Sequence, residues 1–166
     1  VNPLVSNIFD FNEQINPVYG LWNSYSGSKE NQKWKYNLGL RAEQVSNNGE
    51  TANGSDSFSN NYTKFFPSAS VQLNLKSDES VKLGYSKRIN RPDLEDLNPF
   101  VDITDALNPH GGNPYLKPEI IHIAELDYNK EWDKYSFSGN AFYRNANNAI
   151  RQYSILQENG AVLLQP

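Results

Sequence analysis

Hydrophobic and polar residues alternate along this chain with a period of two. Between residues 33 and 44, polar, charged or glycine residues separate Trp34, Tyr36, Leu38, Leu40 and Ala42. Such a period is typical of a β-strand, whose successive side chains point to opposite faces of its sheet. The pattern predicts a strand with one apolar face and one polar face.

The same alternation recurs at residues 68–76, 81–88, 120–132 and 135–144. Residues 9–25 form a sixth candidate strand, whose apolar residues in one phase are Phe9, Phe11, Ile15, Tyr19 and Leu21. Glu13 and Pro17 interrupt this apolar phase, and we expect a β-bulge there. The chain is therefore predicted to be all-β, with about six strands.

Short and long connections take turns between these strands. The connections at 25–32, 77–79 and 133–134 are short, whereas those at 45–61 and 89–119 are long. In an antiparallel meander, alternate connections lie at the same end of the sheet, so one rim has tight turns and the other has long loops. Outer-membrane β-barrels have this arrangement, with short periplasmic turns and longer extracellular loops.

Aromatic residues gather beside the short connections. They are Trp22, Tyr25, Trp34, Trp132 and Tyr135. Aromatic girdles mark the two membrane interfaces of outer-membrane barrels. We expect these five side chains to form a girdle at the rim with the tight turns.

Composition agrees with a barrel that is apolar outside and wet inside. Hydrophobic residues make up 37% of the 166 residues, against roughly 45–50% in ordinary soluble domains. Aromatic residues nevertheless make up 13%, which argues against disorder. The net charge of −4 offers no basic surface, so no nucleic-acid partner is expected. A chain that begins at Val1 and has no Met is expected to be part of a longer protein.

Several motifs occur in a characteristic order along the chain. They are Gly39-Leu40-Arg41-Ala42-Glu43, Phe65-Phe66-Pro67-Ser68, Tyr85-Ser86-Lys87-Arg88-Ile89-Asn90-Arg91-Pro92, Leu97-Asn98-Pro99-Phe100, Gly112-Asn113-Pro114-Tyr115-Leu116-Lys117-Pro118-Glu119, and Phe142-Tyr143-Arg144 followed by Ile150. In their order and spacing, the sequence resembles the barrel domain of TonB-dependent outer-membrane receptors, in the outer-membrane β-barrel family.

The resemblance implies a receptor in the outer membrane of a Gram-negative bacterium. Its complete barrel would have about 22 strands and a plug in its lumen. Residues 1–166 would then be a partial barrel domain, a fragment of a large transmembrane β-barrel without the plug and the remaining strands. The implied partners are outer-membrane lipid, the TonB complex acting through the plug, and an imported ligand. A surface lipoprotein remains open as a further partner. Siderophores, cobalamin and glycans all remain open as substrates.

Charged residues in the polar phase are candidates for contact with the plug or the substrate. These lumen-facing candidates are Arg41, Glu43, Arg88, Arg91, Glu119, Glu125, Asp127 and Arg144. The alternative is a solvated lattice of charges that compensate one another. For Arg88 and Arg91, we expect ion pairs with carboxylates such as Glu119 or Glu125 rather than ligand contacts.

The segment between Arg88 and Glu119 is too long for an unstructured connection, and it is expected to fold back on itself. Its acidic residues are Asp93, Glu95, Asp96, Asp102 and Asp105. Several oxygen ligands can hold Ca²⁺, but this spacing matches no EF-hand loop, so a solvated loop is favoured.

The sequence does not indicate an enzyme. His110 and His122 are the only histidines, Cys is absent, and the chain lacks the Gly-x-Ser-x-Gly and phosphate-binding glycine motifs. No catalytic residue, metal site or cofactor is therefore assigned.

Two other functions remain open on the residues alone. One is a soluble β-sandwich that binds carbohydrate, because Trp, Tyr and Asn suit the faces and hydroxyl groups of sugars. The other is a small structural barrel without transport. The first predicts a closed core, and the second predicts a protein without a plug.

The assignment of faces can be tested by exchanging polarity at adjacent positions of the complete barrel. Leu83→Arg places a charge on the expected lipid face and should cost about 2–4 kcal/mol of unfolding free energy. Lys82→Leu changes the expected lumen face and should cost much less. Equal losses in denaturant unfolding would contradict the assignment.

Overall fold

The fold comes from a computed structural model, which describes residues 8–28, 31–51, 57–76, 78–102, 104–105, 107–156 and 162–166. Within these residues, no helix is long and apolar enough to cross a membrane.

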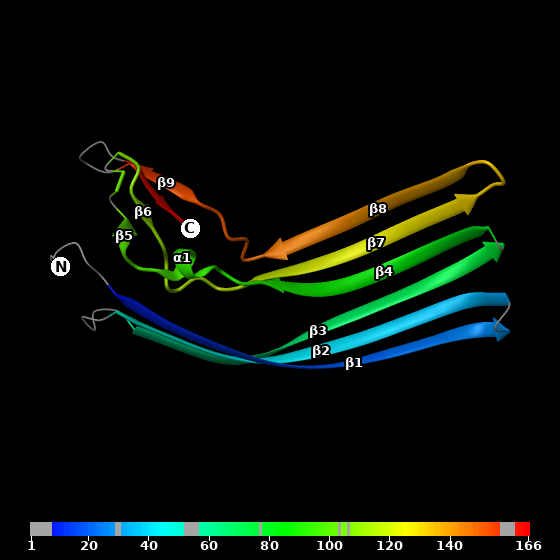
Figure 1. The fold of residues 1–166 in the computed structure, drawn as a ribbon, viewed down its shortest axis with the longest axis horizontal. Coiled ribbons are helices and arrows are strands. Elements are labelled where there is room, and N and C mark those ends of the chain that lie inside the picture. Colours follow the sequence, from blue (N-terminus) through cyan, green and yellow to red (C-terminus); the bar gives the residue numbers. More distant parts are fainter. Residues whose placement is uncertain are drawn as a thin grey trace.

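Six antiparallel strands form one large curved sheet (Figure 1). They are β1 (Phe9–Ser28), β2 (Asn31–Thr51), β3 (Ser57–Lys76), β4 (Glu79–Asn90), β7 (Glu119–Glu131) and β8 (Ser136–Asn147). Their order in the sheet is β1-β2-β3-β4-β7-β8. Each strand of this sheet therefore pairs with the strand of the sheet that comes before or after it in the sequence. The predicted all-β meander of six strands is confirmed.

The segment between β4 and β7, residues 91–118, folds back, as predicted, and helps to build a second, smaller sheet. We call it the folded segment. It contains the short helix α1 (Leu94–Leu97) and the strands β5 (Val101–Asp102) and β6 (His110–Gly111). After β8, the chain adds β9 (Tyr153–Leu156) and β10 (Val162–Gln165), and the order of this sheet is β5-β6-β10-β9. The small sheet lies at the end of the molecule opposite the tight turns (Figure 1).

Strands β2 and β3 are longer than predicted. The sequence analysis placed a loop at residues 45–61, but Val45 pairs with Tyr62 and Glu50 pairs with Ser57. The prediction of a long loop here is wrong, because the polar extension of these strands lacks the apolar alternation by which a strand is recognised. Only residues 52–56 of this stretch lie outside the described residues.

Strand β1 pairs with β2 without interruption past Glu13 and Pro17, so the bulge expected there is wrong. The irregularity in this pairing lies instead between Ser26 and Gly27, and Gly27 has a positive φ of 112°.

The apolar phase of β1 lies on the opposite face from the one its composition suggested. Tyr19 pairs with Arg41, and Leu21 pairs with Gly39. Directly opposed residues share a face of the sheet. The series Phe9, Phe11, Ile15, Tyr19 and Leu21 therefore shares its face with the charged residues of β2, whereas Trp22 pairs with Leu38 on the apolar face.

Following the pairing from strand to strand defines two faces of the large sheet. The polar face carries Glu13, Arg41, Glu43, Lys64, Lys82, Arg88, Glu119, Glu125, Asp127 and Arg144. The apolar face carries Trp22, Trp34, Leu38, Leu40, Phe65, Val71, Leu73, Leu83, Tyr85, Leu126 and Tyr143. Many apolar-face side chains are half exposed, such as Leu38 at 51% and Leu83 at 55%. This face has no second sheet packed on it in the part of the chain that the structure describes.

A small core lies instead on the polar face, where the folded segment after β4 covers the sheet. Its buried hydrophobic side chains are Val45, Phe66, Leu97 and Ile121. Leu97 belongs to α1, and the other three belong to β2, β3 and β7. The core therefore joins the folded segment to the sheet.

Gly112 allows a close backbone contact inside this segment. Its N–H donates to the carbonyl of Asn98 at 2.9 Å, and the N–H of Asn113 donates to the carbonyl of Asp96 at 2.6 Å. A Cβ atom at position 112 would lie 2.5–2.6 Å from three backbone oxygens of residues 95–98. Only glycine fits there, which explains why the segment can fold over α1.

Gly112→Ala should therefore loosen the folded segment and leave the barrel strands paired. Displacing fixed backbone typically costs about 1–3 kcal/mol. We expect faster proteolysis within residues 91–118 of the complete barrel. Gly20→Ala is the matched control, because a Cβ atom at position 20 meets no atom within 4 Å; equal cleavage of the two variants would contradict this account.

Candidate functional site

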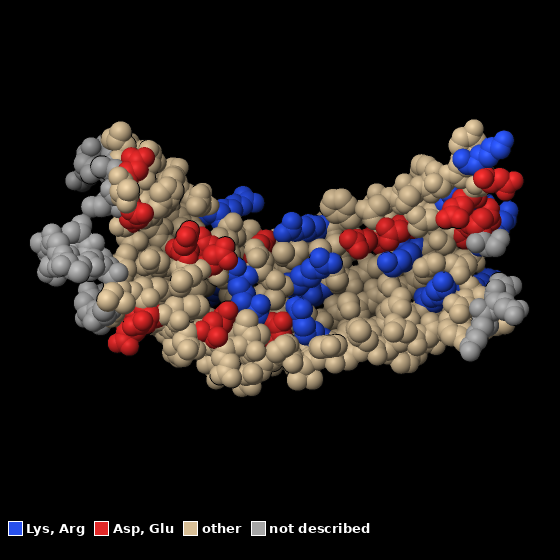
Figure 2. All heavy atoms as spheres, viewed as in Figure 1, with Lys and Arg blue, Asp and Glu red and all other residues tan. Residues whose placement is uncertain are grey.

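The charged candidates from the sequence meet on the polar face. The pairing places Arg41, Glu43, Arg88, Glu119, Glu125, Asp127 and Arg144 at positions on this face. Arg91 follows β4 and contacts the same face through ion pairs. Figure 2 shows Lys and Arg side chains gathered near the middle of the curved molecule, with Asp and Glu among them. Contact of these side chains with a plug or a substrate stays a prediction.

Arg91 links the folded segment to the first two strands. Its guanidinium forms a hydrogen-bonded ion pair with Glu43 of β2 and lies 4.0 Å from Oε1 of Glu13 in β1. Glu43 is only 5% exposed, and its Oε1 also lies 3.0 Å from Nε of Arg41. Arg41 in turn lies over the ring of Phe66, 5.1 Å from its centre. We call these four charged residues, Glu13, Arg41, Glu43 and Arg91, the Arg91 cluster.

The electrostatics of the Arg91 cluster favour the charged form of the guanidinium. Burial alone would lower the pKa of Arg91. The hydrogen bond and the negative charge of Glu43 outweigh this effect, so the pKa of Arg91 is raised above its ordinary value. A buried carboxylate needs such partners because its desolvation would otherwise be costly. Arg91 pairs with carboxylates, as expected, but its partners are Glu43 and Glu13. The named partners Glu119 and Glu125 are wrong, since the chain turns after β4 toward β1 and β2.

Glu119 is held by other residues. It accepts a hydrogen bond from Nδ2 of Asn90 at 3.1 Å and lies 3.8 Å from the guanidinium of Arg144. Arg88 and Glu125 form no ion pair within the described residues, so the expected pairing of Arg88 with Glu119 or Glu125 is also wrong. Arg88 stands opposite Ile121, and Glu125 stands opposite Gly84.

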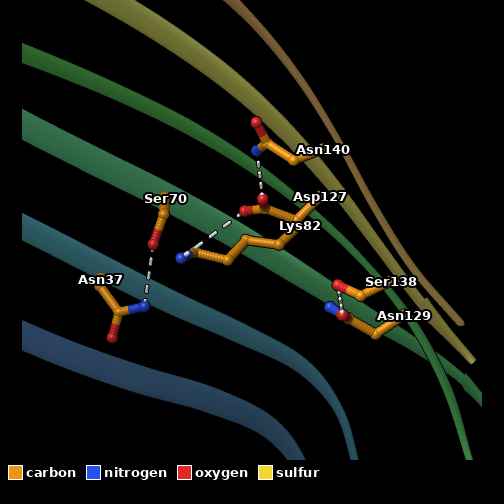
Figure 3. A network of polar contacts seen from close by, with 7 residues as sticks. All are labelled: Asn37, Ser70, Lys82, Asp127, Asn129, Ser138 and Asn140. Atoms are coloured by element: carbon orange, nitrogen blue, oxygen red, sulfur yellow. Dashed lines mark hydrogen bonds and ion pairs between the residues drawn. The ribbon is translucent and has the colours of Figure 1, made fainter. Parts of the chain in front are cut away.

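A second polar network covers the part of the polar face toward the tight turns (Figure 3). Asp127 lies 3.9 Å from Nζ of Lys82 and accepts a hydrogen bond from Asn140 at 2.6 Å. Asn37 donates to Ser70 at 3.0 Å on the neighbouring pair of strands. These contacts join adjacent strands and form the kind of charge lattice that the sequence analysis gave as the alternative to ligand contact.

A cavity of about 490 Å³ separates the folded segment from β1, β2 and β3. Its lining includes Glu13, Asn47, Tyr62, Lys64, Arg91 and Tyr115. Among the described residues, three buried polar atoms at this cavity have no hydrogen-bond partner, namely Oδ1 of Asn47, the hydroxyl of Tyr62 and Nε of Arg91. The cavity can therefore offer polar contacts to a molecule that enters from the side of the long loops.

The aromatic candidates divide between the two faces. Trp22 and Trp34 stand at apolar-face positions, and the backbones of Trp132 and Tyr135 bond to each other across the turn at 2.7 and 3.3 Å. Tyr25 pairs with Lys35 on the polar face, so its assignment to a lipid-facing girdle is wrong. For the other four, a role as a girdle stays a prediction.

An ion cluster marks the rim with the tight turns. Nζ of Lys130 lies 2.7 Å from Asp78 and 3.6 Å from Glu79, and 5.9 Å from the ring centre of Trp132. The hydrogen bond from Lys130 lowers the pKa of the Asp78 carboxyl, which lies in the turn. At this rim, the apolar face is therefore bordered by charged side chains that form ion pairs with one another.

The acidic residues after β4 serve local structure. Asp93 and Asp96 form a reciprocal capping box at the start of α1. Asp102 accepts from the hydroxyl of Thr104 at 2.6 Å, and this bond lowers the pKa of its carboxyl. Asp105 accepts from Asn108 at 3.0 Å. These carboxylates act as turn and cap acceptors.

An antiparallel meander with one apolar and one charged face is the arrangement expected of the wall of a transmembrane β-barrel. A sequence model of the outer membrane protein β-barrel family matches residues 1–166. The chain belongs to this family and forms part of a barrel in the outer membrane of a Gram-negative bacterium. The alternative of a soluble β-sandwich is thereby excluded.

Among solved structures, the chain is similar to the siderophore receptor PirA from Pseudomonas aeruginosa, with a TM-score of 0.54 and 14% sequence identity. The similarity covers 93% of this chain and 37% of the receptor chain. At this identity it supports the fold. No curated protein sequence matches the chain.

Sequence reasoning missed several members of this site. Glu13 was interpreted as a fault in an apolar pattern, whereas it faces Arg91. Tyr62 and Lys64 fell between the loop assigned to residues 45–61 and the strand assigned to residues 68–76, and Lys64 lies 5.3 Å from the ring centre of Tyr62. The signal for Glu13 was the break in the pattern itself, because local rules often fail at functional positions.

Arg91→Ala should destabilise the attachment of the folded segment, because it removes a partner from the buried Glu43. Removing one side of a buried pair costs on the order of 3 kcal/mol. Denaturant unfolding of the complete barrel measures the loss, and the double variant Arg91→Met with Glu43→Gln should recover much of it.

Arg144→Ala serves as the control. Its guanidinium is about half exposed, so loss of its pair with Glu119 should cost about 0–1 kcal/mol. An Arg91 variant no less stable than this control would contradict the assigned role of the Arg91 cluster.

Proposed function

We propose that the chain forms part of the wall and the outer mouth of a TonB-dependent importer. The observation that carries this proposal is the charged polar face with a folded segment clasped onto it by the Arg91 cluster. A face this polar is suited to water, to a plug or to a passing solute, whereas the opposite face is suited to lipid.

The cavity beside the Arg91 cluster supports a binding role at the mouth. It lies at the end of the sheet with the long connection between β4 and β7, and the end with the longer loops is the extracellular one in outer-membrane barrels. Its unpaired polar atoms and the cation of Lys64 provide contacts for a polar nutrient. In this function no bond is made or broken, and the protein is a transporter rather than an enzyme.

The charged residues of the polar face would have different parts in transport. The Arg91 cluster would hold the mouth in shape while a nutrient binds. The unpaired Arg88 and Glu125 would contact the plug, and their contacts would change when TonB pulls on the plug. The solved receptor with a similar fold is named for siderophores, and the substrate of this chain remains one of the siderophore, vitamin and glycan classes.

Uptake by the complete protein tests the proposal. Cells expressing it would be offered labelled ferric siderophore, cobalamin and oligosaccharide, with and without TonB. We expect uptake of one class that is lost without TonB and reduced severalfold by Arg88→Gln.

Lys35→Gln is the control, because Lys35 lies on the polar face away from the Arg91 cluster and pairs with Tyr25 and Gln72. Passage of all three solutes at the same rate without TonB would instead favour a passive barrel, which is the second candidate function.

A further inference from the structure

A shallow apolar groove runs across the apolar face of β1, β2, β3, β4 and β7. Its volume is about 550 Å³. Small side chains at Ala69 and Ala124 leave room between the walls, which include Trp22, Leu38, Leu83 and Tyr85. An aliphatic chain fits this lining because it offers apolar contacts and almost no polar group.

Two polar side chains border one end of this groove. Lys87 and His122 stand directly opposite each other on β4 and β7, at apolar-face positions. The hydroxyl of Tyr85, a groove residue, shares a hydrogen bond of 2.9 Å with Nδ1 of His122. The groove and the polar pair are therefore one continuous feature.

The polar pair has the depth of a lipid headgroup. Glu79 and Lys130 mark the opposite rim, and eight residues separate this row from Lys87 and His122 along each strand. Eight residues of strand span about 26 Å. With the usual strand tilt, the height across the membrane is about 20 Å, close to the apolar band of about 25 Å in outer-membrane barrels. Lys87 therefore lies near the outer boundary of the hydrocarbon.

The charge of Lys87 has no counter-charge beside it on the apolar face of its own strand or of the strands next to it, within the described residues. Across β3, β4, β7 and β8, all within the described chain, Glu79 is the sole carboxylate at an apolar-face position, and it pairs with Lys130 at the far rim. A lysine on the lipid face is unfavourable unless an anion or water reaches it. In the outer leaflet, the phosphate of a lipid supplies such an anion.

We propose that this feature is a binding site for one phosphorylated lipid of the outer leaflet. An acyl chain lies in the groove over Ala69 and Ala124, and the phosphate contacts the ammonium of Lys87 and the ring of His122. Tyr85 positions that ring through its hydroxyl. The site faces the membrane and is separate from the polar face, so it goes beyond the proposed import function and does not depend on it.

Lipid binding to the complete barrel, purified in detergent, tests this site. Native mass spectrometry would compare dioleoyl phosphatidate with dioleoylglycerol, which differ only in the phosphate. We expect the wild-type protein to retain phosphatidate at least tenfold more tightly. Lys87→Gln should abolish this preference, and Lys87→Arg should keep it.

Ala69→Trp tests the groove separately, because it fills the floor and leaves the cation in place. It should weaken binding of both lipids severalfold, whereas Lys35→Gln on the polar face should bind both like wild type. The proposal is overturned if phosphatidate and dioleoylglycerol bind equally, or if Lys87→Gln and Ala69→Trp both bind phosphatidate like wild type. The uptake experiment does not depend on whether this lipid site exists. Failure of the lipid-binding proposal is therefore distinguishable from failure of the import proposal.

Discussion

The requirement that every backbone N–H and C=O in lipid find a partner within the protein underlies this structure. Hydrocarbon offers no hydrogen bonds, so a sheet can cross it only with its strands paired in an unbroken series. From β1 to β8 neighbouring strands pair in such a series, whereas the outer edges of β1 and β8 have no partner strand within the described residues. The pairing holds alternate side chains on opposite faces. Each strand therefore needs side chains suited to lipid at every second position and side chains suited to water at the positions between them. The low hydrophobic fraction of 37% follows, since only one phase needs to be apolar.

The polar face shows what a barrel wall gains from being wet on one side. Charges on this face are tolerated because neighbouring strands and the folded segment supply partners, as Glu43 has Arg41 on its own strand and Arg91 from the segment. The same face carries the small core around Val45 and Leu97, so hydrophobic burial and ion pairing together hold the folded segment at the mouth. The apolar face has the reverse character. Its one unpaired cation among the described residues, Lys87, stands beside a groove suited to an acyl chain.

The sequence predicted most of the architecture and the polar-face residues, because strand period and connection length leave clear traces. It failed where one phase carries both kinds of residue. In β1, Tyr19 and Leu21 look like lipid-facing residues, yet pairing with Arg41 and Gly39 sets them on the polar face. Register depends on the partner strand, which a single strand does not reveal. The partners of Arg91 were also mistaken, since the path of the chain after β4 decides which carboxylate it reaches. An Asn-Gly pair at 159–160 between apolar runs was the available signal for the pairing of β9 with β10.

Which side chains face lipid and which face the lumen can be measured directly, because the chain contains no cysteine and single cysteines can be introduced for labelling. Single cysteines at positions 70, 71, 72 and 73 of β3, each carrying a spin label in the complete barrel in lipid, would report local accessibility. The structure predicts that labels at 71 and 73 are reached by oxygen dissolved in the bilayer, and that labels at 70 and 72 are reached by a water-soluble nickel chelate. Uniform accessibility along these four positions, or alternation in the opposite phase, would contradict the assignment of lipid and lumen faces.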